Sequence, residues 1–263
     1  MKTKIMKMDG KRSKSITLPA IFDEPFRPDL IRKAFTVEMA NKRQPYGPSK
    51  GAGMRHAVST WGKGRGVSRV QRLTQGRTAA ESPNNVGGRR AHPPVVEKVW
   101  SEKINKKEYR KAIRSAVSAT TMSDVVRKRG HRFEDGIDLP LIIEKDFEHL
   151  HELIDKEGED ISYTRKVKET LENIGLGGDL VRAKEGRHIR AGRGKFRGRK
   201  YRVPRSILVV LSEFNGMEKA INNLAGVEVA TPEKLTIEKL APGGDPGRLT
   251  IFTEEAVKKM EEM

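Results

Sequence analysis

Hydrophobic residues recur at two periods along the chain, and these periods predict its helices and strands. In residues 29–40 and 104–120 the apolar positions lie three or four residues apart, which indicates amphipathic helices. The runs 139–144, 206–211, 226–230 and 248–252 are short and rich in Ile, Val and Leu, which is typical of strands buried on both faces. We therefore predict an α/β fold with a parallel sheet of about four strands, covered by helices on both faces.

Capping and turn residues suggest where these elements begin and end. Asp9-Gly10 lies between two alternating stretches and predicts a hairpin near the N-terminus. Asn105, with Glu108 three residues later, predicts a capped helix start. Two further helices are expected over 162–175 and 216–224, the first capped by Ser162 and stopped by Gly175. Thr253 is expected to cap the last helix, and the cluster 175–180 is interpreted as a helix stop and a turn.

Residues 42–103 form a long segment that has neither period. Structureless loops longer than about 12–15 residues are uncommon inside a compact domain. This segment carries Tyr46, Trp61 and many arginines, unlike a bland linker, so we expect an extension that becomes ordered against a partner. The predicted organisation is a globular domain over 1–41 and 104–263, an extended loop over 42–103, and a basic insertion over 182–205.

Composition restricts the class of protein. The chain has 263 residues, 33% of them charged, and no cysteine, which excludes disulfides and cysteine nucleophiles and favours an intracellular location. The N-terminus lacks the apolar core of a signal peptide. The longest apolar run, 207–211, is too short to span a bilayer. A soluble, cytoplasmic chain without membrane contact is expected.

The positive charge is concentrated in two segments. The net charge is +18, and residues 41–94 and 182–205 each contain eleven Lys or Arg and one acid. Each segment therefore carries +10, which leaves a net charge of −2 for the rest of the chain. Charge confined to two glycine-rich segments beside a nearly neutral body indicates a polyanionic partner, usually nucleic acid.

Motifs for catalysis or nucleotide binding are weak. The glycine clusters 47–53, 175–180 and 241–248 contain neither the Gly-Lys-Ser/Thr of a phosphate-binding loop nor a dinucleotide fingerprint after a strand. No two histidines have metal-ligand spacing on one helix face, so no metal site and no catalytic residue are predicted. Two alternatives stay open: an α/β enzyme that uses a nucleotide and is tethered to nucleic acid by basic segments, and a DNA architectural protein.

The two basic segments have the composition of RNA-binding peptides. Glycine allows the backbone to approach a surface closely, and arginine can bind phosphate or stack on a base. Phe196 and Tyr201 could stack on unpaired bases. Neither segment has the helical pattern of a major-groove reader, so folded RNA is favoured over sequence-specific DNA binding.

Five motifs carry a resemblance to a known family. The stretches RQPYGPSKGAG, STWGKGRGVSRV, KINKKEYRKAIRSA, RAGRGKFRGRKYR and LAPGGDPGRLTIFTEEA occur in this order. Together they resemble the family of large-subunit ribosomal protein L-four in its archaeal and eukaryotic form, from about Arg43 to the C-terminus. The resemblance implies a structural, non-enzymatic constituent of the cytoplasmic ribosome, with an α/β domain and a long loop that enters large-subunit rRNA.

The resemblance also implies roles for individual residues. The loop tip would help line the nascent-peptide exit tunnel beside the hairpin of another ribosomal protein, and would face the nascent peptide. The protein would be a monomer within the ribosome, with no cofactor apart from structural Mg²⁺ held by the rRNA. The tip residues would be Ser59, Trp61, Lys63, Arg65 and Arg69. The rRNA-binding residues would be Arg43, Lys50, Arg55, His56, Arg72, Arg77, Arg89, Arg90, Arg187, Arg190, Arg193, Lys195, Arg197, Arg199, Lys200, Tyr201 and Arg202.

Overall fold

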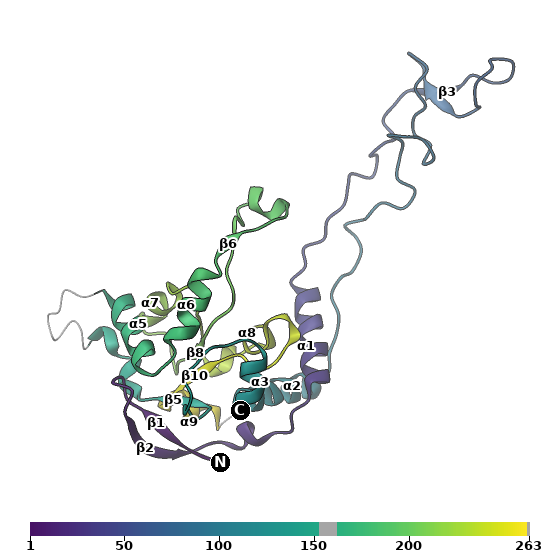
Figure 1. Ribbon diagram of the computed structural model, residues 1–263. Helices are drawn as coiled ribbons and strands as arrows, with labels where there is room; N and C mark the ends of the chain where they lie inside the picture. The colour runs from purple at the N-terminus through teal and green to yellow at the C-terminus, as the bar shows by residue number, and fades with distance from the viewer. Residues whose placement is uncertain (153–161, 262–263) are drawn as a thin grey trace. The chain divides into compact units, whose positions relative to one another are not determined.

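A computed structural model describes residues 1–152 and 162–261 (Figure 1). The chain divides into two compact units. We call Met1–Met39 together with Lys103–Met263 the globular unit, and Ala40–Glu102 the extended unit.

The globular unit contains a mostly parallel sheet. In the described part of the chain six strands lie in the order β2-β1-β5-β10-β8-β9. Strands β1, β5, β10, β8 and β9 run parallel, and β2 pairs antiparallel with β1. The strand bounds are Lys2–Met6 (β1), Arg12–Thr17 (β2), Leu141–Ile143 (β5), Leu208–Val210 (β8), Glu228–Ala230 (β9) and Thr250–Thr253 (β10).

The four predicted strands are confirmed, but the sheet is wider than predicted. The hairpin at Asp9-Gly10 forms as expected, with Gly10 at φ 76°. Its first strand pairs with β5 and so extends the sheet by two strands, one of them antiparallel. The sequence could not show this, because pairing between residues 5 and 142 depends on contacts far apart in the chain.

Helices cover both faces of the sheet. Successive strand residues point to opposite faces, so Ile142 and Phe252 pack in one layer of the core while Ile143 and Ile251 pack in the other. The first layer is completed by η1, α1, α2, α8 and α9, and the second by α3, α5, α6 and α7 (Figure 1). The helix bounds are Ala20–Asp23 (η1), Pro28–Asn41 (α1), Lys106–Ala119 (α2), Ser123–Lys128 (α3), Tyr163–Asn173 (α5), Gly177–Glu185 (α6), Met217–Asn222 (α7), Ile237–Leu240 (α8) and Glu254–Met260 (α9).

The capping predictions had mixed outcomes. The Thr253 side chain accepts a hydrogen bond from the Ala256 N–H, as expected. Gly175 ends α5 at φ 89°, a left-handed conformation that glycine adopts without strain. Asn105 and Ser162 occupy N-cap positions, but their side chains make no capping hydrogen bond, so side-chain capping at these two sites was wrongly predicted.

The interpretation of residues 175–180 as only a stop and a turn was also wrong. The helix α6 begins at Gly177, four residues after α5 ends at Asn173. Its two leading glycines hide the helical pattern, and the helix is held by burial of Leu180 and Ala183 against the core. Arg182 and Lys184 therefore belong to a packed helix.

Candidate nucleic-acid interface

The extended unit has almost no hydrophobic core. All of residues 40–102 are described, and among them Ala80 is the only buried residue. Burial of apolar surface is the main favourable contribution that offsets the loss of chain entropy on folding. A segment of this length with a single buried alanine therefore has little internal reason to hold one conformation.

Polar and cation–π contacts join the two legs of the extended unit near its base. The Arg43 guanidinium lies 3.7 Å from the Trp100 ring centroid. The Asn41 side-chain oxygen accepts a hydrogen bond from the Glu102 N–H at 2.9 Å. Further along, Lys50 pairs with Glu97 at 3.0 Å, but the Lys50 side chain is 90% exposed. Exposed contacts of this kind contribute little to stability.

The distal part of the extended unit contains secondary structure that the sequence did not predict. Strand β3 (Val58–Thr60) pairs antiparallel with β4 (Gln71–Leu73), and Ser59 lies opposite Arg72. The Arg72 guanidinium donates to the backbone oxygens of Arg77 at 2.6 Å and Ser68 at 3.3 Å. This hairpin is short and only half-buried at most, which explains why it leaves no periodic signal in the sequence.

The connection from β3 to β4 is a glycine-rich loop that carries exposed basic side chains. Gly62, Gly64 and Gly66 have positive φ and open space where a side chain would be, which leaves the backbone accessible. The half-buried Trp61 ring lies 5.9 Å from the Arg65 guanidinium and 5.7 Å from that of Arg72. The predicted tip residues Lys63, Arg65 and Arg69 are exposed, whereas Ser59 lies within β3.

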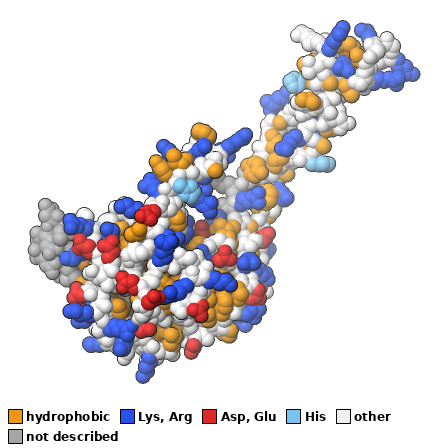
Figure 2. Space-filling view, in the orientation of Figure 1, with side chains coloured by type: hydrophobic (Ala, Val, Ile, Leu, Met, Phe, Trp, Pro, Cys, Tyr) orange, Lys and Arg blue, Asp and Glu red, His pale blue; other side chains and the backbone are white. Residues whose placement is uncertain are grey.

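Most of the basic residues of the extended unit that are predicted to contact RNA are exposed. The exceptions are Arg72, which is bound to backbone oxygens, and Arg89, which is half-buried. The exposed members are Arg43, Lys50, Arg55, His56, Arg77 and Arg90. Figure 2 shows Lys and Arg side chains along this unit, with the acidic side chains gathered over the globular unit.

A second basic element projects from the globular unit. We call residues 187–202 the basic hairpin: β6 (His188–Ile189) pairs antiparallel with β7 (Tyr201–Arg202). A short 3-10 turn, η3 (Arg193–Phe196), lies between them. Phe196 is 82% exposed, so its ring is accessible to a partner.

The basic side chains of this hairpin lie around exposed aromatic rings. The Arg187 guanidinium lies 4.2 Å from the Tyr201 ring, and the Lys195 ammonium lies 5.4 Å from the Phe196 ring. Arg190 is half-buried and donates to the backbone oxygen of Arg199. The remaining predicted residues are exposed: Arg193, Lys195, Arg197, Arg199, Lys200, Tyr201 and Arg202. An exposed ring flanked by cations suits the stacking of an unpaired base beside its phosphate.

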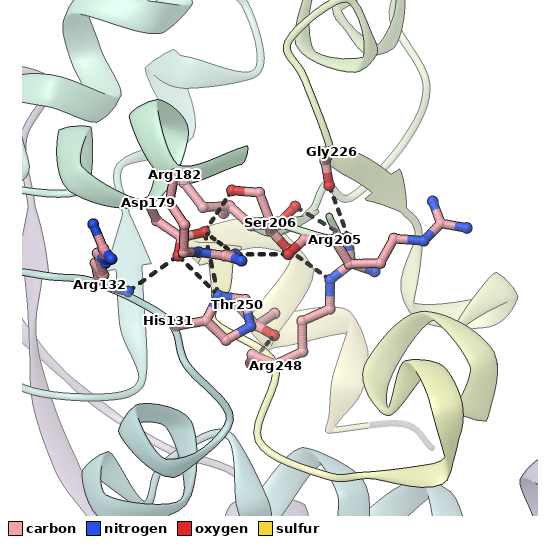
Figure 3. A network of polar contacts seen from close by, with 10 residues as sticks. His131, Arg132, Asp179, Arg182, Arg205, Ser206, Gly226, Arg248 and Thr250 are labelled. Atoms are coloured by element: carbon pink, nitrogen blue, oxygen red, sulfur yellow. Dashed lines mark hydrogen bonds and ion pairs between the residues drawn. The ribbon is translucent and has the colours of Figure 1, made fainter. Parts of the chain in front are cut away.

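Beneath the hairpin, a buried carboxylate anchors α6 to the sheet (Figure 3). Asp179 accepts hydrogen bonds from Arg182 at 2.9 Å, from the Arg132 N–H at 3.0 Å and from the Ser206 hydroxyl at 2.5 Å. The His131 Nδ1 lies 3.1 Å from the same carboxylate. Burial opposes ionisation of Asp179, but the surrounding donors together hold its pKa below the usual range.

Histidine and arginine in this region are structural. Burial lowers the pKa of His131, against the opposing effect of Asp179, so near neutral pH His131 donates to Asp179 as a neutral ring. Arg248 is fully buried and donates to the Ser206 oxygen at 2.8 Å and to Glu228 at 2.5 Å. The glycine-rich run 241–248 therefore ends in an inward-facing arginine.

The carboxyl ends of the parallel strands, where doubly wound enzymes bind nucleotides, are occupied by a buried side chain. Glu148 is 1% exposed and accepts from the Ser212 N–H at 2.7 Å. It also accepts from the hydroxyls of Ser212 and Thr253, at the ends of β8 and β10. These bonds satisfy the carboxylate within the fold and join the strand ends to one another.

Sites of two other kinds are absent from the described residues. Among residues 1–152 and 162–261, no group of three or more His, Asp or Glu side chains is placed to hold a metal ion. No helix in the same ranges is long and apolar enough to cross a membrane.

Some basic residues that the fold brings together were not predicted. Arg32, Lys128 and Arg129 line one surface of the globular unit together with Arg182 and Arg202. The run 127–132, with four Lys or Arg among six residues, was a signal that could have drawn attention to this region. Arg32 gave none, since an isolated arginine on an amphipathic helix is ordinary.

Comparisons with known proteins agree with the resemblance seen in the motifs. The chain is 48% identical over 262 residues to the large ribosomal subunit protein uL4 of Methanothrix thermoacetophila, covering 100% of this chain and 99% of that protein. It is 47% identical to uL4 of Methanocaldococcus jannaschii, with the same coverage, and 43% identical to uL4 of Haloquadratum walsbyi, covering 99% of each. A family model described as ribosomal protein L4/L1 matches residues 16–263, and the chain belongs to this family.

Proposed function

We propose that this chain is a structural, non-catalytic constituent of the large ribosomal subunit that binds large-subunit rRNA. Its relatives are named as large ribosomal subunit proteins over essentially the whole length of the chain. As a ribosomal constituent it acts in translation in the cytoplasm, as one copy per subunit, in contact with neighbouring ribosomal proteins. No cofactor of its own is required, and Mg²⁺ belongs to the rRNA.

The observation that carries this proposal is the combination of charge and missing core in residues 40–102. Residues 41–94 contain eleven Lys or Arg and only one acidic residue. All of residues 40–102 are described, and Ala80 is the only buried residue among them. Phosphates that surround such a segment would neutralise its mutual repulsion and supply the contacts that its own sequence lacks.

Within this function, the parts of the extended unit have different roles. We propose that the basic side chains on either side of the loop between β3 and β4, among them Arg55, Arg77 and Arg90, bind rRNA. The loop between β3 and β4, with Trp61 and Lys63, lies at the wall of the nascent-peptide exit tunnel, beside the hairpin of another protein. The open glycines of this loop allow close approach of its backbone to RNA or to a passing peptide.

The basic hairpin binds rRNA through stacking and charge. Phe196 and Tyr201 offer faces to unpaired bases, and the surrounding arginines contact the adjoining phosphates. The alternative, a nucleotide-using enzyme, has no support from the relatives, and the strand ends where its nucleotide would bind are filled by Glu148.

A binding experiment with RNA, DNA and two matched variants tests the function. We expect the full chain to bind large-subunit rRNA transcribed from Methanocaldococcus jannaschii much more tightly than duplex DNA of equal length at the same salt concentration. Phe196→Ala should weaken RNA binding by about 1–3 kcal/mol, the range for one stacked base. Phe214→Ala is the control, because Phe214 is 42% exposed and lies outside the basic hairpin.

Two outcomes would overturn the proposal. Equal affinity for duplex DNA and rRNA would indicate a DNA architectural protein. A rise in the unfolding temperature with ATP, GTP or NAD would indicate a nucleotide-binding enzyme.

A further inference from the structure

A basic groove lies at the amino ends of β8 and β10 in the globular unit. Its volume is about 960 Å³, and it is bordered by α1, α3, the segment before β8 and the loop before β10. This is the opposite end of the strands from Glu148, so the groove does not occupy the position of a nucleotide pocket in a doubly wound sheet. The cationic side chains along it are Arg32, Lys128, Arg129, Arg182, Arg202 and Arg205.

The groove carries a net positive charge, although three of its six cations are paired: Arg32 with Asp245, Arg182 with Asp179 and Arg205 with Glu228. Its described lining holds one carboxylate, Asp245, which already pairs with Arg32 at 3.3 Å. Low-dielectric walls concentrate the field of such a cluster and attract anions. The walls here include Val125, Pro204 and Pro242.

Two of the arginines are held in place before any ligand binds. Arg182 is fixed by Asp179 and also donates to the Arg205 oxygen at 2.7 Å. The Arg129 guanidinium donates to backbone oxygens of the loop before β10, among them that of Pro242 at 2.5 Å. Preorganised donors lose little entropy when a ligand binds.

Arg129 makes no hydrogen bond or ion pair to a carboxylate in the described residues, although the negative charge of Asp245 acts on it. Among the described residues, the hydrogen-bond partners of its guanidinium are backbone carbonyls, and no carboxylate is among them. Burial lowers the pKa of Arg129, but the group stays protonated at neutral pH. A half-buried cation that has only carbonyl partners is stabilised by an anion that enters the groove.

We propose that this groove binds the phosphate backbone of the same rRNA that the basic hairpin contacts. Arg202 connects the two surfaces, because it belongs to β7 of the hairpin and also lines the groove. This continuity favours RNA over an acidic protein segment. The inference rests on the proposed function and adds to it a third RNA-binding surface, formed by residues of the packed domain.

A matched pair of double variants tests the groove. Arg32→Gln with Lys128→Gln removes two exposed cations from it, and Arg32 is 74% exposed in one ion pair. Lys14→Gln with Arg165→Gln is the control, because it removes an exposed lysine and an arginine that is 72% exposed in one ion pair, both outside the groove lining. Neither pair touches the buried Asp179 network.

The measurement is the dependence of rRNA affinity on salt concentration for the full-length chain. For two lost phosphate contacts, the slope of log K against log salt should become shallower by about 1.4–1.8 in the groove variant. The control should keep the wild-type slope. Equal slopes for the groove variant and the control would overturn the inference.

The design separates failure of the groove from failure of the proposed function. If wild-type protein does not prefer rRNA, the proposed function fails. If it does and the groove variant binds like the control, only the groove assignment fails. Polyglutamate is a second probe: a loss of polyglutamate binding in the groove variant, with unchanged rRNA binding, would assign the groove to an acidic protein segment and overturn the inference.

A cross-link provides a direct check in assembled subunits. The natural chain has no cysteine, so Lys128→Cys introduces one unique site for a photo-activated cross-linker. We expect cross-links from this site to rRNA, and cross-links from Lys14→Cys to be several-fold fewer. Cross-links from position 128 to protein alone would contradict the proposal.

Discussion

In the globular unit, two layers of Ile, Leu, Val and Phe are buried on the faces of a sheet, whereas residues 40–102 bury only Ala80. Both units contain paired strands, yet only the first has an apolar face to cover. Order in the globular unit therefore comes from its own core, and order in the extended unit depends on a partner. A hydrogen-bonded strand pair such as β3–β4 is not sufficient by itself to keep the extended unit in one conformation.

The largest effect is expected from removing the distal part of the extended unit. Replacing residues 55–85 by a short Gly-Ser linker removes six Lys or Arg. If each contacts a phosphate, the slope of log K for rRNA against log salt becomes shallower by about 4–5. Thermal unfolding of the globular unit should be unchanged, because Ala80 is the only buried side chain lost within 55–85.

A charge-only variant sharpens this prediction. Changing the same six Lys and Arg residues to Gln should make the slope of log K against log salt shallower by the same amount, without shortening the chain. If the linker variant unfolds the globular unit, the division into two units with separate sources of order is wrong.

A large effect on folding is expected from the buried arginine. Arg248→Ala removes a fully buried ion-pair partner from Glu228, which keeps only Arg205, and leaves several backbone oxygens without a donor. Such a change is expected to lower the free energy of unfolding by about 3–5 kcal/mol. Urea unfolding measures this. Arg165→Ala, which breaks an exposed ion pair with Glu169, should cost no more than about 1 kcal/mol.

Arg248 also distinguishes structural from RNA-binding arginines. The folded fraction of Arg248→Ala should bind rRNA with the wild-type salt dependence. A shallower salt dependence of rRNA binding in that fraction would mean that the buried Arg248 takes part in RNA binding and is not purely structural.

The smallest effect is a pH dependence of stability. Burial lowers the pKa of His131 in the folded state, so on acidification the unfolded chain takes up a proton first. The stability contributed by the neutral ring is present above about pH 6.5 and declines below it, by at most about 1.4 kcal/mol per pH unit. His131→Asn should flatten the fall in unfolding temperature between about pH 6.5 and pH 5.

The exposed His188 of the basic hairpin provides the control. His188→Asn should leave the pH dependence as in the wild type. Identical profiles for His131→Asn and the wild type would show that the buried pair with Asp179 makes no such contribution.

Local patterns in the sequence determined several features of this protein. Continuous apolar runs predicted β5, β8, β9 and β10, and helical spacing predicted α1 and α2. Charge counts located two basic segments, and five motifs indicated the family to which the chain belongs. Each of these features depends on residues near one another in the chain, which is why a linear reading finds them.

Tertiary structure decided the rest. Pairing of β1 with β5 widened the sheet, and burial of Leu180 made a helix of a glycine-rich turn. Arg248 was turned inward by carbonyls that lie more than forty residues away in some cases. The basic groove brings Arg32 and Arg202 to one surface, although 170 positions separate them. Contacts of this kind have no signature in any short window of sequence, because their energy arises only when distant segments pack together.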